Sequence, residues 1–403
     1  MKAWIRTFVK TFAIILYRVM CVVLPVNKRR IVFDSSLGRS YSGNPRRIFE
    51  YMVENGYVDK WECTWFYEKA PYPIPGKGCQ FRYGRFRYLY YMATAKVWIF
   101  DCRQPEWLIK RKDCLYIQTW HGTPLKKLVL DMDDVFMMHE KDLSSYQDGF
   151  VKNVGIWDVL ISQSPYASNT FRRAFAFEKD MLEIGYPRND ILFSKNNEDD
   201  IRRLKMRLGL PLDKKVMLYA PTFRDDEFDE KASYKFSPKI SFERIREEFG
   251  EEYVLIVKYH YLIMDCIDWL PYKNFIYHFD QSDDIAELFL VSDIMITDYS
   301  SVMFDYSILR RPMFFCAYDL DKYKNELRGF YFDYERELPG PISTNTETLI
   351  RDIRTYDASR YKQRYEDFCR KYNPWDDGRA AAKVVEVVER ALEGRTVQET
   401  ITD

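Results

Sequence analysis

The segment Asp293–Leu309 reads DIMITDYSSVMFDYSIL, and this stretch decides the fold class. Residues Asp293–Thr297 form a short and largely apolar run, which is typical of a buried strand. Ser300 or Ser301 then provides an N-cap for a helix that we expect over Ser301–Leu309. A buried strand that passes through a short polar turn into a helix is one half of a βαβ unit. The segment therefore predicts an α/β fold with a parallel sheet.

The same alternation of apolar runs and helical stretches continues on both sides of this segment, in two sets. The expected strands are Arg30–Asp34, Trp61–Phe66, Lys96–Asp101, Leu115–Trp120 and Asp158–Ser162 in the first set, and Val216–Ala220, Tyr253–Lys258, Asn274–His278, Asp293–Thr297 and Pro312–Cys316 in the second. The expected helices include Pro45–Asn55, Pro165–Phe175, Phe242–Phe249, Asp283–Val291, Ser301–Leu309, Leu349–Tyr372 and Gly378–Leu392. Two doubly wound domains that face a central cleft are the predicted architecture, with ligands at the carboxyl ends of the strands.

The predicted domain boundaries follow the two sets of strands. Residues 1–26 form an N-terminal helix, residues 27–193 the first domain, and the polar segment 194–200 (SKNNEDD) the linker. Residues 201–392 form the second domain, and residues 393–403 form a frayed tail. A chain of 403 residues is too long for one ordinary core and suits two α/β domains.

The composition excludes some classes of protein. Lys and Arg together number 61, as do Asp and Glu, so the net charge is zero, which argues against a general nucleic-acid binder. The eight cysteines include no C-x-x-C pair and have no zinc-site spacing. They are typical of reduced core cysteines in a cytoplasmic protein.

The N-terminal helix has two unlike faces. A spanning helix needs about 20 apolar residues, and Arg18 interrupts this run. The pattern favours an amphipathic helix on the cytoplasmic side of an anionic membrane, with a helix packed on its own domain as the alternative. The apolar face holds Trp4, Ile5, Phe8, Phe12, Ile15, Leu16 and Val19, and the basic face holds Lys2, Arg6, Lys10 and Arg18.

A histidine follows one of the expected strands. Residues 118–127 read QTWHGTPLKK, so His121 emerges on a loop of Gly and Pro where an apolar strand ends. Catalytic groups of open α/β sheets occupy that position, and a histidine can accept a hydroxyl proton near neutral pH. The alternative is a structural or capping histidine.

Groups that suit an anion follow strands of the second set. Arg224 in YAPTFRD (219–225) offers a fork of donors to a phosphate, or a surface ion pair as the alternative. Lys258 and His260 are two residues apart, so they point the same way at a strand end, or they are ordinary edge-strand polarity.

The quoted segment itself suits a phosphate. After Thr297, the helix that Ser300 or Ser301 begins would direct its first N–H groups and the positive end of its dipole outward. The alternative is an ordinary capped helix that binds nothing.

No metal or cofactor site is expected. The sequence contains no GxGxxG, Walker A or HExxH pattern. The D-x-D pattern of Asp131 and Asp133 lies far from any expected strand end, and we interpret it as a solvated loop.

Taken in order, these motifs resemble the CDP-glycerol glycerophosphotransferase family, which includes teichoic-acid primases and polymerases. The resemblance extends from about Ile31 to about Pro341. It rests on FDSSLG (33–38) with YSGNP (41–45), HGTPLK (121–126), APTFRD (220–225), KYH (258–260), TDYSSVMFD (297–305), and RGFY (328–331) with PGP (339–341).

The resemblance implies a GT-B-like fold of two Rossmann-like domains, with an acceptor domain first and a CDP-polyol-binding domain second. It implies that His121 is the catalytic base and that His260 contacts the donor diphosphate. The remaining donor-site residues would be Arg224, Lys258, Thr297, Ser300, Ser301 and Arg328, and the acceptor or structural-loop residues would be Gly122, Thr123 and Asp305.

The implied reaction moves glycerol phosphate from CDP-glycerol to a hydroxyl of a lipid-linked or polymeric cell-envelope acceptor, of teichoic-acid or capsule type, and releases CMP. The expected partners are that donor, that acceptor and an anionic membrane surface, without nucleic acid. Three alternatives stay open: CDP-ribitol as donor, a glycosyltransferase that uses a nucleotide sugar, and a membrane scaffold without activity.

Overall fold

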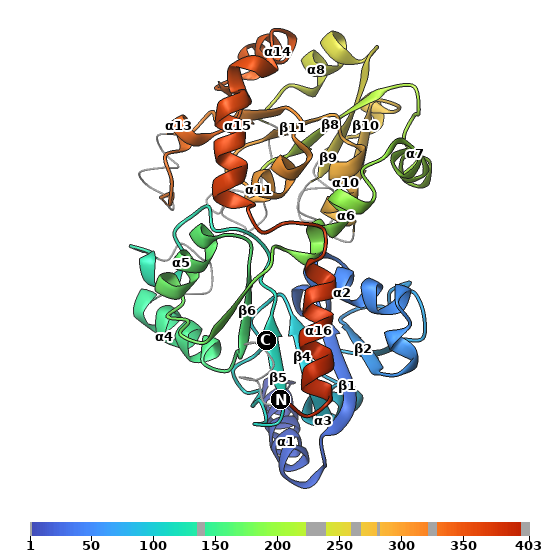
Figure 1. Ribbon diagram of the computed structural model, residues 1–403, viewed down its shortest axis with the longest axis vertical. Coiled ribbons are helices and arrows are strands. Elements are labelled where there is room, and N and C mark those ends of the chain that lie inside the picture. Colours follow the sequence, from blue (N-terminus) through green and yellow to red (C-terminus); the bar gives the residue numbers. More distant parts are fainter. Residues whose placement is uncertain are drawn as a thin grey trace.

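The computed structural model describes residues 2–134, 142–222, 239–258, 267–279, 283–320 and 329–395. Two parallel β-sheets form the centres of two domains, which lie one above the other along the longest axis (Figure 1). The expectation of two doubly wound α/β domains is therefore confirmed.

The first sheet has seven strands in the order β3-β2-β1-β4-β5-β6-β7, and all of its neighbours are parallel. Successive residues of β1 face opposite cores: Val32 lies in one apolar cluster, and Ile31 and Phe33 lie in another. The strands are β1 Asn27–Asp34, β2 Glu62–Tyr67, β3 Cys79–Arg82, β4 Ala95–Phe100, β5 Leu115–Gln118, β6 Val159–Ser162 and β7 Asp180–Glu183, and the helices are α1 Lys2–Val23, α2 Gly43–Glu54, α3 Phe86–Thr94, α4 Leu143–Val154 and α5 Pro165–Ala174.

The second sheet has six strands in the order β10-β9-β8-β11-β12-β13, again with parallel neighbours. Its strands are β8 Lys215–Ala220, β9 Tyr253–Lys258, β10 Ile276–Phe279, β11 Ile294–Thr297, β12 Met313–Cys316 and β13 Ile342–Ser343. Its helices are α7 Glu198–Arg207, α8 Phe242–Phe249, α10 Ile285–Val291, α11 Val302–Tyr306, α13 Tyr334–Glu337, α14 Thr346–Arg354 and α15 Ala358–Tyr372.

Both sheets share one pattern of connections. The chain begins in the middle of each sheet, builds outward to one edge, and then returns to build the other edge. The direction reverses between β1 and β4 in the first sheet and between β8 and β11 in the second. Ligands of open α/β sheets bind beside the carboxyl ends of the strands at such a switch point.

The chain crosses between the domains twice. The first crossing follows helix α6 (Asp190–Ser194), and the second lies between the end of α15 and helix α16 (Ala380–Leu392). Helix α16 packs on the first sheet, because Val384 and Val388 share a core with Ile31. The predicted second domain, 201–392, is therefore wrong at its end: its last helix belongs to the first domain.

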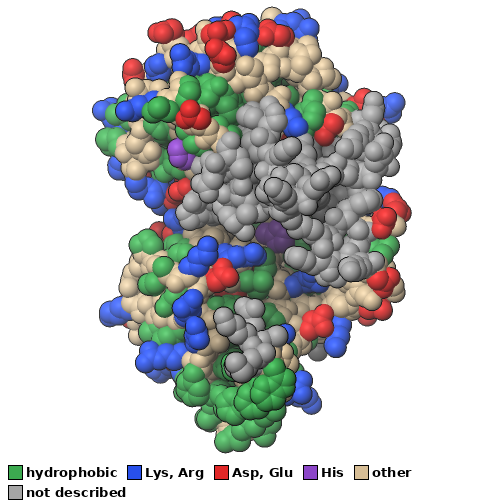
Figure 2. All heavy atoms as spheres, turned by 180° about the vertical axis from the view of Figure 1, so that it is seen from behind, with side chains coloured by type: hydrophobic (Ala, Val, Ile, Leu, Met, Phe, Trp, Pro, Cys, Tyr) green, Lys and Arg blue, Asp and Glu red, His purple; other side chains and the backbone are tan. Residues whose placement is uncertain are grey.

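Helix α1 packs on the first domain with one face and presents apolar side chains to solvent with the other. Tyr17 is fully buried, and its hydroxyl donates a hydrogen bond to the carbonyl oxygen of Ile109 at 2.6 Å. Trp4, Phe8 and Phe12 are 73%, 62% and 60% exposed. Apolar side chains gather at the end of the molecule where α1 lies (Figures 1 and 2). Among the described residues, no helix combines the length and the hydropathy that crossing a membrane requires.

Candidate active site

The loops that follow β5 and β11 meet between the two domains. Gly122 lies so close to the second domain that a Cβ added there would be 3.1 Å from the hydroxyl oxygen of Ser301. Glycine suits this approach, since a Cβ at position 122 would be in tight contact with the side chain of Ser301 and its φ of 156° is one that other residues rarely adopt. The loop of His121 and the loop of Ser300 and Ser301, which sequence analysis placed in different domains, therefore form a single site.

His121 is held by its backbone and by its ring. The preceding residue, Trp120, has a left-handed backbone with φ of 52°, and its ring stacks on the imidazole with the centroids 4.2 Å apart. Nδ1 of His121 lies 3.1 Å from the carbonyl oxygen of Asp101, at the end of β4. A carbonyl oxygen only accepts hydrogen bonds, so Nδ1 carries the proton in the neutral ring. Nε2 is then left with a lone pair that can accept a proton.

The surroundings of His121 favour the neutral imidazole. The residue is exposed to solvent, but Trp120 covers one face of the ring and Nδ1 lies against the carbonyl oxygen of Asp101, so protein replaces part of the water around the imidazole. This desolvation lowers the pKa of His121 below its usual value, and the guanidinium of Arg188 acts in the same direction, while the contacts with Asp101 oppose both. A neutral histidine near pH 7 is the form that a general base requires.

The ends of β1 and β4 are joined where the first sheet changes direction. The carboxylate of Asp101 accepts hydrogen bonds from the hydroxyl of Ser35 at 2.5 Å and from the backbone N–H of Ser36 at 2.8 Å. The carbonyl of the same aspartate orients His121. The FDSSLG motif therefore holds Asp101, whose carbonyl oxygen contacts the His121 ring, in place.

Asn44, in the YSGNP motif, holds the backbone of the His121 loop by hydrogen bonds. Its amide nitrogen donates to the carbonyl oxygens of Thr119 and Trp120 at 3.1 Å and 3.0 Å. Its amide oxygen accepts a hydrogen bond from the backbone N–H of Arg188 at 3.0 Å. The side chain is almost completely buried, so these bonds exchange little with water.

Arg188 connects the His121 loop to the second domain. It lies in the short helix η4 (Pro187–Asn189), which follows β7. Its guanidinium donates to the carbonyl oxygen of His121 at 2.7 Å and forms an ion pair with Asp305 of α11. Asp305 is buried and also accepts a hydrogen bond from Asn189 at 2.9 Å. One arginine thus bridges the loop that carries the histidine and the helix that follows Ser301.

Asp305 belongs to a larger buried network. The amide of Gln163 donates to Asp305 at 3.3 Å and to Asp376 at 2.7 Å, while its oxygen accepts from the hydroxyl of Thr123. Asp376 lies at the second crossing of the chain, and burial raises its pKa to about 7. The predicted residues Thr123 and Asp305 therefore serve to hold the domains together around Gly122 and His121.

The residues of the second domain differ in how they face this site. Ser300 and Ser301 are partly exposed, whereas Thr297 is buried and its hydroxyl donates to the carbonyl oxygen of Ala220 at 2.7 Å. Thr297 thereby joins β8 and β11 at the switch point and does not offer its hydroxyl to a ligand. Lys258 ends β9, and its ammonium group donates to the carbonyl oxygen of Asp283 at 2.8 Å.

The expected helix Ser301–Leu309 is shorter than predicted. Helix α11 spans only Val302–Tyr306 and continues as the 3-10 helix η6 (Ser307–Leu309). Ser301 has a helical backbone and makes no side-chain capping bond, and the hydroxyl of Ser300 is 3.5 Å from the N–H of Val302. A serine therefore precedes the helix as expected, with Ser301 at the N-cap position, but the hydroxyl that reaches a backbone N–H of the first turn is that of Ser300.

Three predicted site residues, Arg224, His260 and Arg328, lie outside the described residues. The segment directly after Arg328 returns to the His121 loop, because the N–H of Lys127 donates to the carbonyl oxygen of Gly329 at 3.3 Å. The motifs APTFRD and RGFY each have a described residue that is hydrogen-bonded near the site. Ala220 accepts from Thr297, and Gly329 accepts from Lys127.

The aspartates of the D-x-D pattern are engaged in ion pairs. Asp131 accepts two hydrogen bonds of 3.0 Å from Arg173, and Asp133 pairs with Lys127 at 2.6 Å. Across the described part of the chain, no three His, Cys, Asp or Glu side chains are grouped as metal ligands.

Comparisons with known proteins agree with this geometry. A model of the family described as CDP-glycerol:poly(glycerophosphate) glycerophosphotransferase matches residues 15–390. The chain belongs to this family. The resemblance inferred from the motifs is therefore confirmed.

Relatives of this chain are named as teichoic-acid polymerases or transferases. The teichoic acid poly(glycerol phosphate) polymerase of Bacillus subtilis is 43% identical over 91% of this chain, which spans 50% of that relative's length. The teichoic acid glycerol-phosphate transferase of Staphylococcus aureus is 40% identical over 90% of this chain and 93% of its own. A solved structure of the wall teichoic acid polymerase TagF, a histidine-to-asparagine variant soaked with CDPG, superposes with a TM-score of 0.87 at 37% identity, covering 94% and 93% of the two chains. The GT-B-like fold that the family implies agrees with this superposition.

Sequence reasoning found Thr123 and Asp305 but missed other residues that position the site. Arg188 and Asn189 follow β7, a strand that the apolar pattern does not reveal, and Asp376 lies in the second crossing. Asn44 was available as a signal, since it belongs to one of the family motifs, but the sequence does not say that it reaches the His121 loop.

Proposed function

We propose that this protein transfers glycerol phosphate from CDP-glycerol to a hydroxyl group of a teichoic-acid-type acceptor and releases CMP. The observation that supports this most is the placement of His121, whose Nδ1 is directed at the carbonyl of Asp101 while its loop touches Ser301 of the other domain. A base and a set of N–H donors then lie on the two loops that meet between the domains. Family membership supplies the donor.

In the proposed reaction, His121 Nε2 accepts the proton of the acceptor hydroxyl as that oxygen attacks the β-phosphorus of CDP-glycerol. The bond between that phosphorus and the bridging oxygen breaks, and CMP leaves with the electron pair. Such transfers depend on in-line positioning and on neutralisation of charge more than on covalent catalysis. The donors for the diphosphate would be the backbone N–H groups at Ser300 and Ser301 together with Lys258.

We assign Arg224, His260 and Arg328 to the same diphosphate from their sequence motifs alone. Each side chain can carry a positive charge that offsets the charge of the phosphates. Thr297 is assigned a supporting role, because its buried hydroxyl holds the β8 and β11 loops together. The donor would thus bind the second domain, and the acceptor would enter from the side of the first.

A panel of donors tests the proposed function. The full chain is incubated with CDP-glycerol, CDP-ribitol or nucleotide sugars, together with a lipid-linked acceptor, and the released nucleotide and the product bond are measured. We expect CMP release and a phosphodiester product with CDP-glycerol. Release of a nucleotide from a sugar donor, with a glycosidic product, would replace this proposal by a glycosyltransferase, and no turnover with any donor would favour a scaffold.

We further propose that α1 lays its apolar face on an anionic membrane surface. Trp4, Phe8 and Phe12 are exposed although they are large and apolar, and Lys10 and Arg18 lie on the same helix. Such helices bind at the boundary between headgroups and acyl chains. A lipid-linked acceptor would be found at this surface, which is consistent with the proposed reaction.

Substitution of two aromatic residues of α1 is expected to release the protein from membranes. Phe8→Ser combined with Phe12→Ser removes apolar area that would be buried in lipid, so binding to vesicles that contain phosphatidylglycerol should fall about 10-fold or more. Vesicle co-sedimentation measures this. The matched control is Leu270→Ser, an exposed apolar residue of the second domain (77% exposed), which should not change binding. Equal binding by the double variant and the unmodified chain would place the membrane contact elsewhere.

A further inference from the structure

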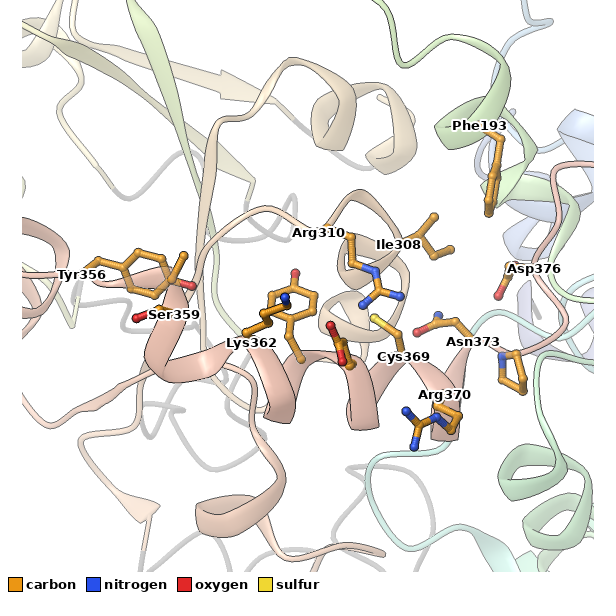
Figure 3. A pocket seen from close by; sticks show the side chains of 14 residues that line it. Phe193, Ile308, Arg310, Tyr356, Ser359, Lys362, Cys369, Arg370, Asn373 and Asp376 are labelled. Atoms are coloured by element: carbon orange, nitrogen blue, oxygen red, sulfur yellow. The ribbon is translucent and has the colours of Figure 1, made fainter.

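A cavity lies at the two crossings between the domains, and the His121 loop does not line it. Its volume is about 950 Å³, and its walls come from α6, the end of η6 and one side of α15. Phe193 lies in α6, directly before the first crossing, and Asn373 and Asp376 belong to the second crossing; all three lie at the same end of the cavity (Figure 3). We call this cavity the hinge pocket.

The hinge pocket contains cations that have no ion-pair partner within the described part of the chain. Arg310 is exposed and extends from the end of η6 toward α15 (Figure 3). Its backbone is left-handed, with φ of 56°, which non-glycine residues seldom adopt. Lys362 is exposed on α15 and lines the same space. A third cation, Arg370, is paired with Asp367 at 3.3 Å.

The remaining lining suits a polyol. Glu366 contributes a carboxylate that can accept hydrogen bonds from hydroxyl groups, and Ile308 and Ala358 contribute apolar surface for a carbon chain. A guanidinium and an ammonium group in the wall of one cavity match the negative charge of a phosphate. The volume is at the upper end of the range for drug-sized ligands, about 300–1,000 Å³, so it exceeds what one small phosphate ester needs.

We propose that the hinge pocket binds a phosphorylated polyol, with Arg310 and Lys362 on the phosphate and Glu366 on a hydroxyl. The choice of polyol rests on the proposed function, because a glycerol phosphate unit is what that reaction adds. The ligand is either a unit of the poly(glycerol phosphate) chain or a free glycerol phosphate, which share this chemistry.

A ligand in this pocket would touch the segment that fastens the domains together. The carboxylate of Asp376 accepts hydrogen bonds from Gln163 at 2.7 Å and from the N–H of Tyr186 at 3.1 Å. Gln163 in turn reaches Asp305, the partner of Arg188. The two crossings are in close contact, since a Cβ added at Gly378 would lie 2.8 Å from Phe193. Through Asp376, the pocket therefore borders the network that holds Asp305 and Arg188.

Calorimetric titration of the full chain, without CDP-glycerol, tests the proposal. The probes are glycerol 3-phosphate, a synthetic oligo(glycerol phosphate) and uncharged glycerol. The test variant is Arg310→Asn with Lys362→Gln, because asparagine tolerates the left-handed backbone at position 310 and both changes remove charge. The matched control is Arg364→Gln, an exposed arginine of α15 that does not line the pocket.

We expect the double variant to bind the phosphorylated probe about 10-fold more weakly or worse, while the control binds as the unmodified chain does. An oligomer that binds more tightly than glycerol 3-phosphate assigns the pocket to the polymer, and equal affinities assign it to the free ester. Equal binding by the double variant and the unmodified chain, or an equal loss in Arg364→Gln, overturns the proposal. CMP release measured on the same proteins separates the two claims, since it tests the proposed function and does not require the hinge pocket.

Discussion

Replacement of His121 by alanine is expected to lower the turnover of CDP-glycerol by about 10²- to 10⁴-fold. Nδ1 of this ring is directed at the carbonyl oxygen of Asp101, so Nε2 is the nitrogen that can accept the proton of the acceptor. Alanine removes that proton acceptor and leaves the backbone loop in place. Steady-state CMP release in the presence of acceptor measures the effect, and circular dichroism checks that the fold is retained.

The pH dependence of kcat/KM in the unmodified protein gives a second test of the role of His121. Because its surroundings lower the pKa of His121, the neutral base persists below the usual titration range of histidine, about pH 6.5. The value of kcat/KM should therefore rise with pH along an acid limb whose midpoint lies below about 6.5, and this limb should be absent from the residual activity of His121→Ala. Near-normal turnover in the alanine variant would remove His121 from the mechanism.

Replacement of Arg188 by alanine is expected to lower turnover by about 10²-fold, although we do not place Arg188 in contact with the reacting atoms. Its guanidinium holds the carbonyl of His121 at 2.7 Å, and a displacement of a catalytic group by about 1 Å can cost that much. The change also leaves Asp305 buried without its ion-pair partner, which costs about 3–5 kcal/mol of stability. Thermal unfolding measured beside turnover separates the two effects.

The pH profile distinguishes positioning of His121 from a merely structural role of Arg188. The positive charge of Arg188 helps to lower the pKa of His121, so its removal should shift the acid limb of kcat/KM to higher pH. Arg188→Lys keeps a charge and should keep the limb close to its original position, while it loses the two-pronged contact with His121 and Asp305. An Arg188→Ala variant with reduced stability but an unchanged acid limb and unchanged kcat would contradict this role.

The central strands were predictable from the sequence, and of the edge strands only β10 was expected, as Asn274–His278. Strands β1 and β11 each contain three consecutive buried apolar residues, 31–33 and 294–296, which a linear pattern reveals. By contrast, β3 and β7 lie at the two edges of the first sheet and contain no fully buried residue, so they lack that pattern. Helix α16 has a clear apolar stripe, but the stripe does not say which of two sheets it covers.

The site was predictable to a similar degree. A histidine or a serine pair at a strand end can be recognised in the sequence, because parallel strands bring their carboxyl ends to one edge. The contact of Gly122 with Ser301 cannot, since it depends on how the two domains meet. The same holds for the contacts of Arg188 with Asp305 and of Asp376 with Tyr186, which join residues more than 100 positions apart in the chain.

Our proposal that the second domain binds the donor, while the first supplies the base, can be tested by titrating CDP-glycerol into three forms of the full chain. These are the unmodified protein, His121→Ala and Ser301→Pro. Proline suits the backbone of Ser301, whose φ is −64°, and it removes both the hydroxyl and an N–H donor. Our account predicts that His121→Ala binds CDP-glycerol nearly as tightly as the unmodified protein, whereas Ser301→Pro binds it more weakly. Loss of donor binding in His121→Ala, with binding retained in Ser301→Pro, would place the donor in the first domain and contradict the proposed mechanism.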